Sequence, residues 1–129
     1  MTIQANMLSL PEYTRQSITG IPATGLNAGS GSSQTTAVLI PSDFNVYTTV
    51  ASTNAVILPW GVDGTTAGPV QIGDTITTVN HGANPLLVYP QSGGKIQNGS
   101  ANADFSVTNN KTCEFFYIGG GNWGAALGN

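Results

Sequence analysis

Charged side chains are scarce in this sequence. Asp, Glu, Lys and Arg make up only 7% of its 129 residues, and the formal net charge is −3, whereas a typical globular domain carries about 25% charged residues. A surface of Ser, Thr, Asn, Gln and Gly suits close packing against other subunits. The three basic residues, Arg15, Lys95 and Lys111, lie far apart in the sequence, and binding to nucleic acid or anionic lipid requires clustered cations. We therefore expect neither nucleic acid nor membrane among the partners.

Histidine, cysteine and long apolar segments are nearly missing as well. His81 is the only histidine, which excludes a histidine metal cluster, and we interpret it as a turn residue. Cys113 is the only cysteine, and its Cys-Glu-Phe-Phe-Tyr setting predicts a small apolar strand residue. No segment approaches the roughly 20 apolar residues of a membrane helix, and the N-terminus lacks a signal-peptide pattern. We expect a protein made in the cytoplasm, with no membrane span.

Patterns that carry catalysis are weak. Gly119, Gly121 and Gly124 match a dinucleotide-binding fingerprint, but that fingerprint must open a helix inside a βαβ unit, so we interpret these glycines as a hairpin turn. No Gly-x-Ser-x-Gly nucleophile motif occurs. Most carboxylates lie beside predicted turns, where Asp commonly caps its own backbone. We predict no catalytic, cofactor-binding or metal-binding residue and no enzyme; a polysaccharide-degrading carboxylate pair is a third, weaker alternative.

From Gln34 onward, short β-prone runs alternate with turn residues about every ten positions, a spacing typical of all-β sandwiches and barrels. No segment has the period and length of an ordinary helix. We predict one compact sandwich or barrel-like domain, residues 34–129, of eight or nine short antiparallel strands. The β-prone runs are 34–40, 44–53, 55–60, 70–72, 74–80, 86–89, 95–97, 105–108, 112–118 and 123–127.

The stretch from Asn80 to Pro90 shows this design most clearly. A cluster of turn residues ending at Pro85 directly precedes the apolar run Leu-Leu-Val-Tyr, which predicts a turn followed by a buried strand. In the run before it, Ile76 and Val79 are the expected core residues.

An internal echo accompanies this stretch. Residues 48–59 and 77–90 both run from a β-prone segment through a polar turn that contains Asn to an apolar run and a proline. We interpret the two segments as paired β-hairpins of the same design.

Residues 1–33 have no sustained period. Their scattered apolar side chains are interrupted by Pro11, Pro22 and several glycines, and they end in the Gly/Ser linker 29–33. This composition predicts an extended N-terminal arm with apolar anchors, and the alternative is a partly disordered tail. The anchors are Leu8, Leu10, Tyr13, Ile18 and Ile21.

The sequence between about residues 34 and 126 resembles a small β-domain of tailed-bacteriophage virion proteins, which recurs in capsid decoration (cement) proteins, head fibres and tail-fibre appendages. The resemblance is carried by Thr78-Val79-Asn80, Gly82-Ala83-Asn84, Leu87-Val88-Tyr89-Pro90, Gly93, Ile96-Gln97-Asn98-Gly99, Ala101-Asn102, Val107, Phe116-Tyr117 and Trp123. It implies a compact β-domain behind an N-terminal arm, frequent trimers and no catalytic residues.

We therefore expect a non-enzymatic virion structural protein. In the leading hypothesis it is a capsid cement protein on the capsid exterior, made in the host cytoplasm, whose five arm anchors and homotrimer contacts bind the major capsid protein and stabilise the shell. The alternative is a receptor- or carbohydrate-binding module of a tail or head fibre, in which aromatic rings stack on sugars. Trp60, Tyr89 and Trp123 are the leading candidates for that stacking, with Tyr47 and Tyr117 beside them. These aromatic residues suit core and subunit-interface positions as well, and we favour that interpretation.

Overall fold

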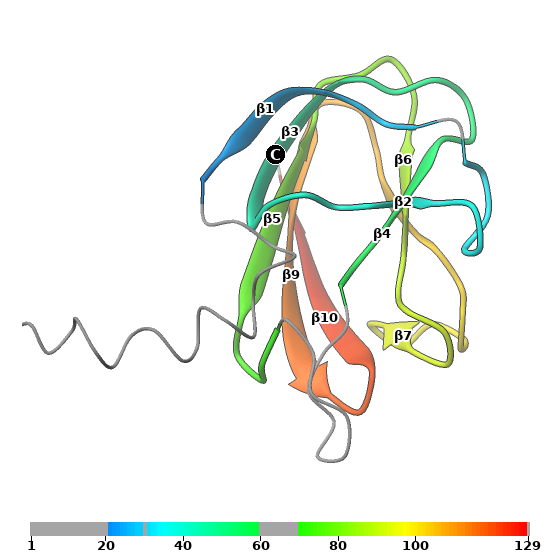
Figure 1. Cartoon of the computed structure of the whole chain (residues 1–129), viewed down its shortest axis with the longest axis vertical. Coiled ribbons are helices and arrows are strands. Elements are labelled where there is room, and N and C mark those ends of the chain that lie inside the picture. The colour runs from blue at the N-terminus through cyan, green and yellow to red at the C-terminus, as the bar shows by residue number, and fades with distance from the viewer. Residues whose placement is uncertain (1–20, 30, 60–69, 129) are drawn as a thin grey trace, which may run out of the picture.

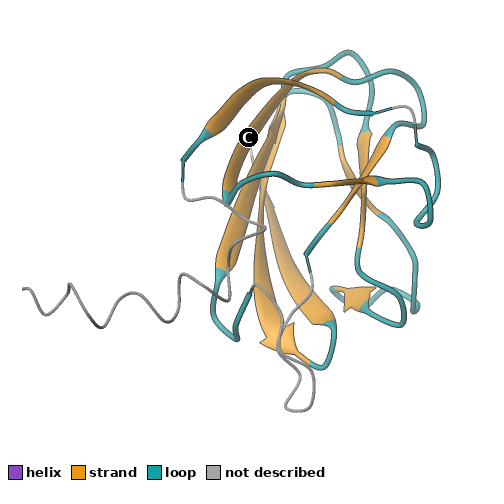
Figure 2. Cartoon of the chain, viewed as in Figure 1, coloured by secondary structure: helices purple, strands orange, loops and turns teal. Residues whose placement is uncertain are grey.

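The structure is a computed structural model, and it describes residues 21–29, 31–59 and 70–128 (Figure 1). In this part of the chain, strands and loops alternate without a helix (Figure 2), which confirms the all-β class. The strands are β1 (Ala23–Asn27), β2 (Val38–Leu39), β3 (Phe44–Thr49), β4 (Ala55–Ile57), β5 (Thr75–Asn80), β6 (Leu86–Tyr89), β7 (Lys95–Ile96), β8 (Phe105–Val107), β9 (Lys111–Gly119) and β10 (Asn122–Gly128).

These strands form two mixed sheets. The larger sheet has the order β1-β3-β5-β9-β10-β7, and the smaller has the order β2-β4-β6-β8. Among the first six strands every pairing is parallel: β1 with β3, β3 with β5, β2 with β4 and β4 with β6. Antiparallel pairs join β5 to β9, β9 to β10 and β6 to β8. β7 pairs in parallel with β10. The prediction of antiparallel strands is therefore wrong for the first six strands and for β7.

The chain crosses from one sheet to the other after each of its first strands. β1, β3 and β5 lie in the larger sheet, whereas β2, β4 and β6 lie in the smaller one. One strand of the larger sheet and the following strand of the smaller sheet thus form one winding of a flattened coil. We call these windings coil 1 (β1 and β2), coil 2 (β3 and β4) and coil 3 (β5 and β6). Successive coils stack in register, with Tyr47 beside Asn80 in the larger sheet and Ile57 beside Tyr89 in the smaller.

The sequence echo marks two stacked coils. β3 and β4 lie in different sheets, as do β5 and β6, so the interpretation as paired hairpins is wrong. A hairpin and a coil share the order of strand, polar turn and strand. They differ only in whether the second strand returns to pair with the first, and the turn residues alone do not decide that.

In coils 2 and 3, an asparagine in the connection between the two strands donates a hydrogen bond to the coil before it. Asn54 Nδ2 donates to the carbonyl oxygen of Ala28 at 2.6 Å, and Asn84 Nδ2 donates to that of Val50 at 3.0 Å. Both acceptors are the first residue after a strand of the larger sheet, where a carbonyl group leaves the strand ladder and needs another donor. The repeated asparagine is thus the part of the echo with a direct structural role.

The buried side chain of Asn80 holds the connection between β5 and β6 through hydrogen bonds. It is fully buried; its Nδ2 donates to the carbonyl oxygens of Asn84 and Val107, and its Oδ1 accepts from the backbone N–H of Gly82, each at 2.8 Å. The predicted turn before Pro85 is confirmed, and His81 lies exposed on it.

A turn of three glycines joins β9 to β10, which are neighbouring strands of the larger sheet. Gly119, Gly120 and Gly121 all have positive φ (99°, 64° and 80°), a conformation that glycine adopts without a steric penalty. The hairpin interpretation is confirmed for Gly119 and Gly121, because the two strands that flank them pair antiparallel. It is wrong for Gly124, which lies within β10 and pairs with Phe116.

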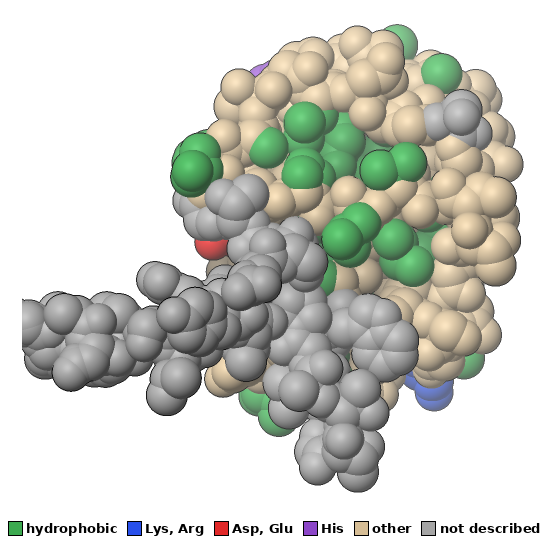
Figure 3. Space-filling view, viewed as in Figure 1, with side chains coloured by type: hydrophobic (Ala, Val, Ile, Leu, Met, Phe, Trp, Pro, Cys, Tyr) green, Lys and Arg blue, Asp and Glu red, His purple; other side chains and the backbone are tan. Residues whose placement is uncertain are grey.

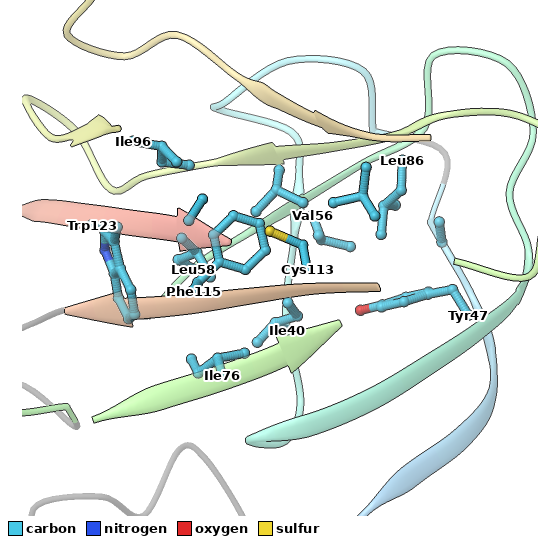
Figure 4. Close-up of a cluster of buried hydrophobic side chains, with 14 of the residues drawn as sticks. Ile40, Tyr47, Val56, Leu58, Ile76, Leu86, Ile96, Cys113, Phe115 and Trp123 are labelled. Carbon is cyan, nitrogen blue, oxygen red and sulfur yellow. The ribbon is translucent and has the colours of Figure 1, made fainter. Parts of the chain in front are cut away.

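The core lies between the two sheets (Figure 4). The smaller sheet supplies Val56 and Leu86 among others, and the larger sheet supplies Ile76, Phe115 and Trp123. Ile76 is therefore a core residue as predicted.

Val79 is only half-buried, and the prediction that it belongs to the core is wrong. Side chains alternate between the two faces of a strand, so positions 76 and 79 cannot share a face. The inward positions after Ile76 are Thr78 and Asn80, which are both polar and buried.

The domain begins earlier than Gln34. β1 lies within the predicted arm 1–33, yet it pairs in parallel with β3 as the edge strand of the larger sheet. The backbone N–H of Ala28 also bonds the carbonyl oxygen of Thr49 at 2.9 Å. Residues 23–28 are therefore part of the β-domain, and residues 1–20 lie outside the described residues.

Candidate functional site

An apolar cleft lies beside coil 1. β1 and β2 are the edge strands of their sheets, so within the described residues no further coil covers coil 1 on that side. The cleft has a volume of about 130 Å³. Its lining residues include no charged side chain; they are Leu26, Asn27, Gly29, Val38, Leu39, Pro41, Tyr47 and Val56.

Coil 1 covers coil 2 incompletely. Tyr47 and Val56 are buried core residues of coil 2, yet they still line the cleft. In coil 1 the side chains of Val38 and Leu39 are 51% and 41% exposed. Stacked repeats usually end in a unit with a polar outer face, and contiguous exposed apolar surface commonly marks an interaction site. The end of this stack is therefore the best candidate for binding a partner.

The backbone at this end is shaped for close approach of β1 and β2. A Cβ added at Gly29 would lie 2.5 Å from Cγ2 of Val38, so a side chain at this position would force that of Val38 to shift. Gly25 has a φ of 67°, and the pairing of β1 with β3 shifts register on both sides of Leu26. Irregular edges of this kind resist addition of another strand. We therefore expect a partner to insert side chains into the cleft and not to extend the sheet.

The surface around the cleft carries little charge. Figure 3 shows apolar side chains gathered between β1 and β2, with the few coloured Lys, Arg, Asp and Glu atoms near the margins of that face. A neutral apolar surface favours a partner that is itself apolar and weakly charged.

Burial raises the pKa of two interior groups, Cys113 and Tyr47. Burial raises the pKa of the Cys113 thiol to about 12, although a backbone hydrogen bond at Ala126 lowers it, and burial raises the pKa of Tyr47 as well. A protonated thiol is a poor nucleophile, and Cys113 is a fully buried strand residue as predicted. Within the described ranges, no three His, Cys, Asp or Glu side chains are grouped to hold a metal ion.

Most predicted arm anchors cannot be placed. Leu8, Leu10, Tyr13 and Ile18 lie outside the described residues, as does Trp60. Ile21 is described: its side chain is 74% exposed, and its carbonyl oxygen accepts a hydrogen bond from Ser42 Oγ at 2.6 Å. The residue before Ser42 is Pro41, which lines the cleft. The first described residue, Ile21, is therefore held one residue away from the cleft lining.

The aromatic candidates that the structure describes do not form one platform. Trp123 is 0% exposed and packs against Tyr117, with ring centroids 5.1 Å apart and an interplanar angle of 63°. It is a core residue and presents no ring face for a sugar, and Tyr117 is buried with it. Tyr89 is half-buried on β6 of the other sheet; burial raises its pKa, with Asp104 contributing in the same direction.

Sequence reasoning missed the cleft residues on β2. The run 34–40 was expected to form one strand, but only Val38 and Leu39 do so, because the backbone N–H groups of Thr36 and Ala37 bond the carbonyl oxygen of Ser33 in a turn. Two adjacent apolar residues after a polar stretch are a weak signal. Their exposure depends on β2 being an edge strand, which the sequence does not state.

Comparison with known proteins gives no relative. No family model matches the chain, and neither a curated protein nor a solved structure matches it significantly. The described residues contain no helix long and apolar enough to cross a membrane.

Proposed function

We propose that this chain is a non-enzymatic assembly protein, and specifically a capsid decoration protein that binds the major capsid protein on the outer face of a virion. The observation that carries the proposal is the uncharged apolar cleft beside coil 1, next to the point where the N-terminal segment enters the domain. It gives the domain a candidate binding surface near Ile21, the one predicted anchor that is described.

The composition supports the same proposal. A chain with 7% charged residues buries few charges when its surface packs against a neighbouring subunit, and so avoids the large desolvation cost of buried charge. Each apolar contact contributes modestly, at about 25 cal/mol per Å² buried. Several chains joined in a homotrimer bind a shell more tightly, because their arms engage together.

We further propose that the two sheets form a sandwich and not a barrel. The sheets share one core cluster, and each sheet has its own edge strands: β1 and β7 in the larger, β2 and β8 in the smaller. A closed barrel has no edge strands.

The alternative, a carbohydrate- or receptor-binding fibre module, has weaker support. It requires aromatic rings that face solvent, but Trp123 is fully buried and Tyr89 is only partly exposed. Trp60 lies outside the described residues, so its contribution remains a prediction.

Co-sedimentation tests the proposal. The full-length protein is mixed with empty shells of the virus that encodes it, and bound protein is measured after pelleting. Saturable binding that survives an excess of free monosaccharides supports decoration. Binding to a glycan array without binding to shells would replace the proposal with the fibre alternative.

The arm is tested in the same assay with a matched control. The substitutions Leu8→Ser, Leu10→Ser and Ile18→Ser made together should weaken shell binding by at least about tenfold, because three apolar contacts of roughly 1 kcal/mol or more each are lost. Ile118→Ser, at a site that is also exposed and apolar, should leave binding unchanged.

A further inference from the structure

The cleft and the N-terminal segment lie within easy reach of each other. The described chain begins at Ile21, whose backbone is held by Ser42 beside the cleft residue Pro41. Ten extended residues span about 30 Å. The segment is therefore long enough to reach from Ile21 into a cleft of about 130 Å³. A segment tethered this close has an effective concentration in the millimolar range.

The two surfaces are also chemically matched. Residues 1–20 contain one acidic and one basic side chain, Glu12 and Arg15, so their formal side-chain charges cancel. Their apolar side chains include Met7, Leu8 and Leu10, and the cleft is lined by apolar and uncharged residues. Covering Val38 and Leu39 would remove from water apolar surface that is now about half exposed.

We propose that residues 1–20 fold back onto their own domain and insert apolar side chains into the cleft beside coil 1, acting as the missing cap of the coil stack. The segment then has two binding places, its own domain and an external partner, and a partner must displace it from the cleft before binding it. This intramolecular cap does not require the partner to be a capsid, so the inference stands or fails separately from the proposed function.

Disulfide trapping in the full-length chain tests the cap. The variant Leu10→Cys/Leu39→Cys places one thiol in the segment and one at the cleft. The matched control Leu10→Cys/Ile118→Cys places the second thiol at the C-terminal end of β9. In Figure 1 this end of the strand lies at the bottom of the view, well away from β2. Leu39 and Ile118 are both exposed, at 41% and 54%, so both substitutions should be tolerated. Cys113 is buried and its thiol pKa is raised to about 12, so it should not compete.

The readout is the rate of disulfide formation under mild oxidation at low protein concentration, followed on non-reducing gels. We expect the cleft pair to form an intramolecular disulfide at least about tenfold faster than the control pair, because the cap raises the local concentration of one thiol at the other. Equal rates for the two pairs would overturn the proposal. A disulfide-linked dimer as the main product of the cleft pair would also overturn it, and would identify the segment of a second copy as the occupant.

A second pair, Met7→Cys/Val38→Cys, repeats the test with a different register. Far-ultraviolet circular dichroism confirms that each variant is folded before oxidation. If both cleft pairs are folded and neither forms a disulfide faster than the control, residues 1–20 do not cap the cleft.

Discussion

Asn84 donates a hydrogen bond from its Nδ2 to the backbone carbonyl oxygen of Val50, at 3.0 Å. Asn54 makes the equivalent bond to Ala28 one coil earlier. Each bond joins the turn of one coil to the end of a strand in the coil before it, so the turns help to fix how successive coils align. The alignment of the coils in turn places β1 and β2 side by side at the cleft.

Removing the asparagine in a coil turn should destabilise the domain. Asn84→Ala leaves the Val50 carbonyl without its side-chain donor, and we expect the free energy of unfolding to fall by about 1–2 kcal/mol. Urea unfolding followed by tryptophan fluorescence measures the change. Asn109→Ala is the control, because Asn109 lies exposed in a turn; equal losses for both variants would show that the bond to Val50 contributes nothing.

Gly82 should not tolerate a side chain. A Cβ there would lie 2.6 Å from the backbone nitrogen of Val50, and this contact with backbone can be relieved only by moving coil 2 and coil 3 apart. We expect Gly82→Ala to lower the free energy of unfolding by about 1–3 kcal/mol, as overpacking does. Gly128→Ala adds a methyl group with no contact closer than 4.0 Å and should have little effect; a tolerated Gly82→Ala would contradict the observed packing.

The domain should lose stability in alkaline solution. Burial raises the pKa of Cys113 from 9.0 to about 12, so the folded state keeps its proton where the unfolded state has released it. The stabilisation is present in full below the unfolded pKa and is lost as pH rises from about 9 towards 12. Tyr47, whose pKa burial also raises, acts in the same direction.

Urea unfolding at increasing pH measures this loss. Cys113→Ala should show a shallower decline above pH 9, where the unfolded thiol ionises, and Tyr47→Phe should show one at somewhat higher pH. At neutral pH, Tyr47→Phe should cost little, because no hydrogen bond joins the Tyr47 hydroxyl to another described residue. Parallel pH curves for the parent and both variants would rule out this linkage.

The sequence predicts where the strands lie in the chain but not which strands pair or in which direction. The β-prone runs before Pro90 and around Phe115 form strands near their predicted positions, because alternation and turn residues are local signals. Whether two strands pair in parallel or antiparallel depends on which sheet, and which neighbouring strand, the chain reaches after each connection. The echo of Asn54 and Asn84 indicated repetition, but its stacked arrangement required the backbone path.

The candidate site was only partly predictable. Of the predicted anchors only Ile21 is described, and its carbonyl oxygen bonds Ser42 next to the cleft residue Pro41. Leu39 and Tyr47 were not expected to line a cleft. Their role follows from the edge position of coil 1, which is a property of the whole sheet order. Trp123 shows the same limit, because its sequence suits a surface platform, a subunit interface or a core, and only the packing places it in the core.

The most direct test of the account is the mass of shells saturated with the full-length protein. A decoration protein should add a fixed number of copies per shell, in multiples set by the symmetry of the shell, and reach that number at a defined free concentration. We predict a saturating mass increase of this kind that is lost when Leu8, Leu10 and Ile18 are replaced by Ser. No increase in mass, or an increase that grows without limit as protein is added, would contradict the proposal that this chain decorates a capsid.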